Sequence, residues 1–86
     1  MPYIKQTDRD NLDPAITRLA NLIKPEHRAG ELNYIITKLL LLNKGDGKYK
    51  DYNELIGMLE CCKQEFYRQH IAPYEDEKIK KNGNVL

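Results

Sequence analysis

The residues best able to do chemistry in this 86-residue sequence are two adjacent cysteines and two histidines. Neighbouring positions on a helix point about 100° apart, so Cys61 and Cys62 are not expected to hold one metal ion from a regular helix. Cys62 and His70 share a face but lie two turns apart, about 12 Å in rise, which is too far for a shared zinc ion. We therefore expect no metal and no cofactor, with Cys62 in the core and Cys61 half-buried beside it.

Other catalytic and nucleotide-binding patterns are absent from the sequence. It contains no serine, which removes Ser-His-Asp catalysis. The segment 45–48, Gly-Asp-Gly-Lys, lacks the preceding strand and the spacing of a phosphate-binding loop, so we interpret it as an ordinary turn. The carboxylates can all be assigned to helix caps and solvated faces. The sequence therefore predicts a protein that is not an enzyme.

The aromatic composition is skewed towards tyrosine, with six Tyr, one Phe and no Trp. Several of these tyrosines lie beside cations: Tyr3 is near Lys5, and Tyr49 stands between Lys48 and Lys50. A ring beside a cation suits a protein interface, and it suits base stacking combined with phosphate pairing. It also suits a helix flank whose hydroxyl group reaches water. These three interpretations stay open at this point.

Charge and hydropathy exclude several classes of protein. Lys and Arg number 14 and Asp and Glu number 13, so the net charge is +1 and bulk charge does not bind this chain to nucleic acid or a membrane. The longest apolar run, Leu39–Leu42, is far shorter than the roughly 20 residues of a membrane span. Charged residues follow the first six positions, so no signal peptide is expected. We expect a cytoplasmic protein.

Apolar residues recur at spacings of three and four, which predicts an all-α fold. We expect one domain over 1–86, built as a small bundle of three main helices and a short C-terminal helix. The expected helices cover about 13–24, 31–42, 51–71 and 73–81, with an N-terminal arm at 1–7 and a tail at 82–86. The turn at 43–48 contains two glycines and is expected to close an antiparallel hairpin of the second and third helices. The first helix would pack across that hairpin.

The first boundary is predicted from a cap and a proline. Asp13 can serve as the N-cap, with Pro14 at the first helical position, where its missing N–H costs nothing. An earlier start near Thr7 or Asp8 stays open, since an acidic residue suits a first turn.

The later boundaries are predicted in the same way. Asp51 and Glu54 form the D-x-x-E variant of a capping box at the start of the third helix. Pro73 is expected to begin a separate short helix, although a kink in one long helix also fits. Gly83 is expected to end that helix.

The second helix carries apolar residues on more than one face. Four leucines in a row spread over the full circumference, because each residue turns the helix by about 100°. One face can meet the other helices of the chain, and another remains. We therefore expect a homo-oligomer, a dimer or higher, with Leu39, Leu41 and Leu42 in its interface.

Any surface for a partner or ligand is expected at the N-terminal arm together with the start of the third helix. These two segments hold rings and cations, and the free N–H groups of a helix start favour an anion. Asp51 opposes this placement, because its carboxylate occupies the cap. The alternative is that the arm only covers the hydrophobic edge of the bundle. The candidate residues are Tyr3, Lys5, Arg9, Tyr49, Lys50, Tyr52 and Asn53.

Four segments of the chain resemble a family of small uncharacterised proteins from prokaryotes and their viruses. The segments are MPYIKQ at 1–6 with DR at 8–9, GELNY at 30–34, YNELIG at 52–57 with LEC at 59–61, and APYEDEKI at 72–79 with NG at 82–83. The resemblance covers nearly the whole chain. It implies a phage or mobile-element context, and it implies no established activity, so it assigns no functional residue.

Two functional hypotheses follow. The first is a non-enzymatic interaction module that binds or inhibits a host protein, as the size, near-neutral charge and surplus apolar surface indicate. The alternative is an oligomeric sponge that sequesters a small anionic ligand, such as a cyclic-nucleotide immune signal. Its support is the pairing of tyrosines with cations, together with an analogy of size and class to inhibitors of host defence.

Overall fold

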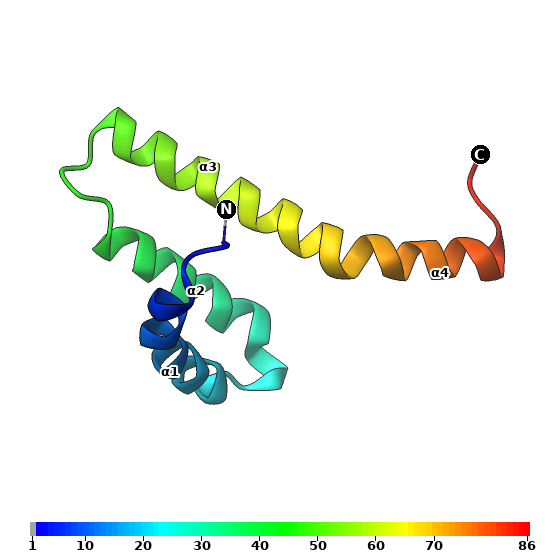
Figure 1. The fold of residues 1–86 in the computed structure, drawn as a ribbon, viewed down its shortest axis with the longest axis horizontal. Helices are drawn as coiled ribbons and strands as arrows, with labels where there is room; N and C mark the ends of the chain where they lie inside the picture. The colour runs from blue at the N-terminus through cyan, green and yellow to red at the C-terminus, as the bar shows by residue number, and fades with distance from the viewer. Residues whose placement is uncertain (1) are drawn as a thin grey trace. The chain divides into compact units, whose positions relative to one another are not determined.

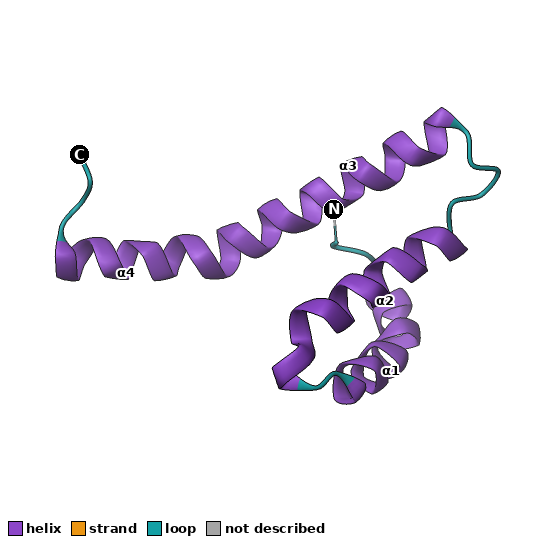
Figure 2. Cartoon of the chain, turned by 180° about the vertical axis from the view of Figure 1, so that it is seen from behind, coloured by secondary structure: helices purple, strands orange, loops and turns teal. Residues whose placement is uncertain are grey.

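A computed structural model of the chain describes residues 2–86, and all regular structure in that range is helical (Figures 1 and 2). The elements are α1 (Gln6–Leu22), the short 3-10 helix η1 (Pro25–His27), α2 (Arg28–Leu42), α3 (Tyr49–Phe66), the π-helix η2 (Tyr67–Ile71) and α4 (Ala72–Asn82). The all-α class predicted from the sequence is therefore confirmed. The structure divides into two units, residues 2–55 and residues 56–86.

Helix α1 begins earlier than the Asp13 cap predicts. It starts at Gln6 and contains Pro14 in its interior, so the N-terminal arm ends at residue 5 rather than 7. The prediction that Pro14 occupies the first helical position is wrong, and the earlier start that the sequence left open is the one observed. A proline inside a helix removes one backbone hydrogen bond, so other contacts must support the first turns.

Side-chain hydrogen bonds provide that support at the start of α1. The Gln6 side-chain amide donates to the carboxylate of Asp10 at 2.8 Å. The Arg9 guanidinium reaches back and donates to the carbonyl oxygen of Ile4, also at 2.8 Å. The carbonyl of Lys5 accepts the first backbone hydrogen bonds of the helix. The extra N-terminal turns are thus held by five residues that precede the predicted cap.

A tight corner joins α1 to α2. Pro25 begins η1, and the backbone N–H of Lys24 donates to the carboxylate of Glu31 at 2.7 Å. Helix α2 begins at Arg28, three positions before the predicted start. Glu31 thus lies in the first turn of α2 rather than at its first position. A carboxylate in this place is favourable, because the N-terminal end of a helix carries partial positive charge.

The turn between α2 and α3 depends on its glycines, as predicted. Gly45 and Gly47 have φ values of 63° and 72°, in the left-handed region that glycine adopts without penalty. Helix α3 then begins at Tyr49. The side chain of Asp51 accepts a hydrogen bond from the backbone N–H of Lys48 at 3.1 Å. Asp51 is thus the third residue of the helix and not its N-cap, so the predicted pairing with Glu54 is wrong.

The chain remains helical from α3 through η2 into α4 (Figure 1). The predicted restart at Pro73 is correct in that α4 begins at Ala72 with Pro73 in its first turn. No loop separates it from α3, because the π-helix fills the interval. Gly83 ends α4 with a φ of 86° and an N–H that donates to the carbonyl of Ile79 at 2.8 Å, as expected of a terminator. The tail comprises 83–86, since Asn82 is helical.

Neither unit contains a buried core. No residue in the described range 2–86 is buried, and large apolar side chains such as those of Leu42, Ile56 and Phe66 are 61 to 72% exposed. The prediction that Cys62 lies in a core with Cys61 half-buried is wrong, because both thiols are exposed and free. The helical stripes are present, and within each unit they are covered only in part.

Candidate interaction surface

The N-terminal arm forms a groove with the first turns of α1. Tyr3 and Ile4 of the arm line this groove together with Arg9, Leu12 and Ile16 of α1. Tyr3 and Ile4 remain 52% and 41% exposed, so the arm covers the apolar face of α1 only in part. The structure thus brings together the ring and one of the two cations that the sequence placed at this site.

The second predicted cation of the arm, Lys5, has a structural position. It is the residue before α1, and its carbonyl accepts hydrogen bonds from the N–H groups of Asp8 and Arg9, both at 3.0 Å. Lys5 does not line the groove. Of the two predicted cations, Arg9 is therefore the one that lines the groove with Tyr3.

The start of α3 holds the other predicted residues, and its N-terminal end is occupied. The Asp51 carboxylate accepts from the N–H of Lys48, which leaves an anion less room there. The Tyr52 hydroxyl lies close to the backbone of Gly47, so this tyrosine packs on the turn. Tyr49 is 83% exposed and is the ring at this end most accessible to a partner.

Two further predicted residues, Lys50 and Asn53, lie on the first turns of α3 and are exposed. The groove of the arm is lined by residues of the range 2–16 alone, so the start of α3 is not part of it. The sequence placed both segments in one surface. The structure shows a groove at the arm and a separate, internally capped helix start.

The leucines predicted for an oligomer interface are exposed in the single chain. Leu39, Leu41 and Leu42 have exposed fractions of 48, 57 and 72%. Consecutive positions on α2 point in different directions, so this apolar surface surrounds the helix rather than forming one stripe. The other helices of the unit 2–55 leave these three leucine side chains exposed.

The cysteines and histidines do not form a metal centre within residues 2–86, where no cluster of three or more metal-binding side chains occurs. His70 contacts Phe66 instead, with ring centroids 5.3 Å apart. The two residues are four positions apart, which is the spacing that sets side chains above one another on a helix.

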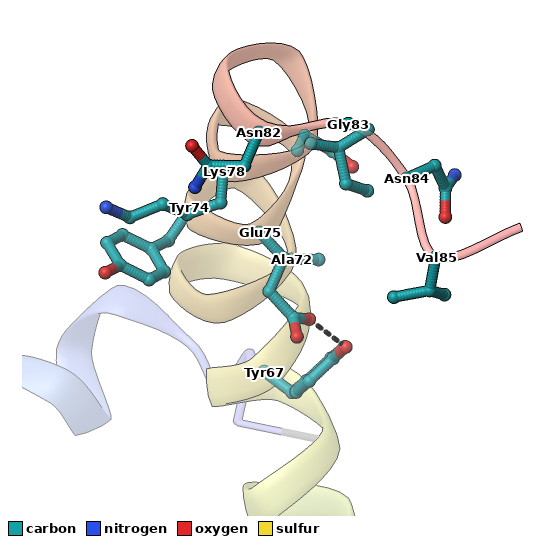
Figure 3. A pocket seen from close by; sticks show the side chains of 11 residues that line it. Tyr67, Ala72, Tyr74, Glu75, Lys78, Asn82, Gly83, Asn84 and Val85 are labelled. Atoms are coloured by element: carbon teal, nitrogen blue, oxygen red, sulfur yellow. Dashed lines mark hydrogen bonds between the residues drawn. The ribbon is translucent and has the colours of Figure 1, made fainter.

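The unit at 56–86 holds a cluster of polar contacts that sequence reasoning missed. The hydroxyl of Tyr67 donates a hydrogen bond to the carboxylate of Glu75, eight residues later (Figure 3). This hydrogen bond raises the pKa of the Tyr67 hydroxyl, because ionisation would remove the donated proton and would also place two negative charges together. Nearby, the ammonium of Lys78 lies 5.6 Å from the centre of the Tyr74 ring. The signal that could have located this cluster is a proline inside an otherwise helical pattern.

Ion pairs precede this cluster along the helix. The Arg68 guanidinium pairs with Glu65 at 2.5 Å and, with a hydrogen bond from Gln69, lowers the pKa of the Glu65 carboxyl. Lys63, aided by Gln64, lowers the pKa of Glu60 in the same way. On α4, Lys80 pairs with Glu77 at 3.4 Å, three positions apart. These exposed pairs each contribute little to stability.

The described part of the chain, residues 2–86, contains no helix with both the length and the apolar character needed to cross a membrane. The fold defines a small all-helical protein with exposed apolar faces. Comparison with known families matches residues 1–85 to a domain of unknown function, DUF6899, and the chain belongs to that family. A search of the curated proteins found no match, and neither did a search of the solved structures.

Proposed function

We propose that this chain is a non-enzymatic helical protein that acts as a homo-oligomer and binds a partner protein. The observation that carries the proposal is the absence of any buried residue in 2–86, combined with the exposure of nearly all its large apolar side chains. Ordering a chain of this size costs conformational entropy that only apolar burial can offset. Helices without such burial are marginal in water. Something must therefore cover these faces in the working protein.

We propose a second copy of the chain as the first cover. Packing α2 against α3 as an antiparallel hairpin, with α1 across it, would bury one stripe of each helix. That bundle would still leave the further faces of α2 that Leu41 and Leu42 occupy. A closed dimer is the commonest way for a small domain to obtain the missing burial. Apolar surface that remains in the dimer would be available to another protein.

The assembly is tested by light scattering under reducing conditions. We expect a mass of at least two chains for the wild type at high micromolar concentration. The Leu42→Glu variant should give the mass of one chain, because it places a charge in the interface. Lys38→Glu, an exposed position on the same helix, is the matched control and should leave the mass unchanged. A wild-type mass of one chain over the whole concentration range contradicts the proposal.

We propose further that this chain is encoded by a phage or mobile element and that its partner is a cytoplasmic protein of the host cell. The support is the resemblance of the chain to small proteins of prokaryotes and their viruses. Affinity capture from host lysate, with identification by mass spectrometry, tests it. The captured protein should bind the purified chain directly, and the Tyr3→Ala variant should bind it more weakly than a Tyr74→Ala control does. A host proteome in which no protein binds the purified chain would count against this proposal.

A small anionic ligand is the second candidate, favoured by the groove where Tyr3 and Arg9 lie together. A ring beside a guanidinium can stack on a base while the cation pairs with a phosphate. Thermal shift with a panel of nucleotides tests this function. A ligand at a hundred times its dissociation constant adds about 2.7 kcal/mol, which such a scan detects easily. If no nucleotide shifts the melting temperature, the protein partner is favoured.

A further inference from the structure

Pro73 lies within a run of helix that extends from α3 to α4. A proline in this position cannot donate to the carbonyl four residues earlier, and its ring presses against that carbonyl. The π-helix η2 comes just before the proline, and at its end the N–H of Ala72 donates to the carbonyl of Tyr67, five residues back rather than four. A π-turn of this kind contains one additional residue compared with an α-turn.

The additional residue changes which side chains share a face. In an uninterrupted α-helix, residues eight apart point about 80° away from each other. With one residue absorbed by the π-turn, they point as residues seven apart do, within about 20°. Tyr67 and Glu75 are eight apart and flank the proline, and the tyrosine hydroxyl donates to the glutamate carboxylate (Figure 3). Their hydrogen bond therefore fits the π register and not the α register.

We propose that the Tyr67–Glu75 hydrogen bond is a latch that holds α4 in the π register. Pro73 disfavours the α register, and the latch selects the continuous π-containing helix over a helix that breaks at the proline. Both residues are exposed, so a binding partner can reach and open the latch. Opening it would free α4 to change its direction or its rotation relative to α3.

The register has a consequence for the surface of this unit. Phe66, His70, Tyr74 and Lys78 follow one another at every fourth position, and contacts join them in pairs. In the latched register Phe66 and Tyr74 point within about 20° of each other. In the α register Tyr74 would turn about 80° away from the line of Phe66. The latch thus determines whether these rings form one continuous row.

The experiment detects the backbone hydrogen bond itself. Through-bond NMR couplings identify which carbonyl accepts from the N–H of Ala72. In the wild type we expect the correlation with Tyr67. In Pro73→Ala, where the α register becomes accessible, we expect the same correlation, because the latch persists. In Pro73→Ala combined with Tyr67→Phe, which deletes only the hydroxyl group, the correlation should move to Arg68, four residues back.

Matched variants separate the latch from general effects on stability. Pro73→Ala combined with Tyr74→Phe removes a neighbouring hydroxyl and should keep the Ala72–Tyr67 correlation. Because removal of a helix-interior proline stabilises the helix, these variants are expected to remain helical by circular dichroism. The proposal is overturned if Pro73→Ala alone moves the correlation to Arg68, which would mean that the proline alone sets the register. It is equally overturned if the double variant with Tyr67→Phe retains the correlation with Tyr67.

Discussion

The carboxylate of Asp51 accepts a hydrogen bond from the backbone N–H of Lys48 at 3.1 Å. A side chain from the first turn of α3 therefore caps Lys48, the residue just before the helix. A methyl group placed on Gly45 would lie 3.6 Å from the same side chain, at ordinary van der Waals distance. One carboxylate therefore joins the first turn of α3 to the glycine turn before it. This contact gives the turn a defined geometry without any buried residue.

Replacing Asp51 by Ala is expected to destabilise the start of α3 by about 1 kcal/mol, because the backbone N–H of Lys48 loses its acceptor. Chemical denaturation followed by circular dichroism measures the change. Asp46→Ala, in the adjoining turn, is the control and should cost less. Equal losses from the two variants would show that the cap contributes nothing specific.

Gly47→Ala should be more damaging than Gly45→Ala. Both glycines have positive φ, which costs an alanine about 1 kcal/mol or more. At Gly47 the new methyl group would also lie 2.8 Å from the hydroxyl oxygen of Tyr52, whereas at Gly45 its nearest neighbour lies at 3.6 Å. Combining Gly47→Ala with Tyr52→Phe should recover part of the stability. Denaturation midpoints that fail to recover would contradict the close approach.

Pro14→Ala should stabilise the protein by up to about 3 kcal/mol, since Pro14 lies in the interior of α1 and lacks the N–H that a helix requires. If Pro14 instead occupied the first helical position, the same change would be neutral or slightly unfavourable. Thermal unfolding separates the two outcomes. Helical content from circular dichroism should rise with the melting temperature.

Acid should weaken the helix around Glu65. The Arg68 pair lowers the pKa of this carboxyl below 4.5, so the unfolded state binds the proton at a higher pH than the folded state does. The stabilisation is present above about pH 4.5 and is lost as the pH falls through the lowered pKa. Glu65→Gln should remove this part of the acid transition. Glu54→Gln is the control, and an identical acid profile for the two variants would contradict the prediction.

Much of the secondary structure follows from residues with a single structural use. Gly83 ends α4 and the glycines at 45 and 47 form the turn because only glycine adopts positive φ readily. The predicted start of α1 at Asp13 is wrong because an aspartate before a proline fits an N-cap as well as it fits a helix interior. The earlier start is stabilised by the side-chain hydrogen bonds of Gln6 and Arg9. Asp51 shows a similar ambiguity, since an acidic residue can cap from inside a helix as well as from its edge.

The polar cluster of the second unit was less accessible to sequence reasoning. Tyr67 and Glu75 meet only because the π-turn shifts the helical phase by one residue. A period of 3.6 residues carries no sign of that shift, so the pair falls on different faces in any regular projection. The groove at the N-terminal arm was easier to predict, because Tyr3 and Arg9, which both line it, are only six residues apart in the sequence.

The two exposed thiols at positions 61 and 62 give each chain two points of covalent attachment. A molecule with two such points forms up to two disulfides when it is oxidised, so a pair of chains either closes on itself through both or extends to a third chain through the thiol that remains. Loss of reducing agent would therefore give covalent dimers together with longer linked products. A chain with Cys61→Ala would stop at covalent dimers.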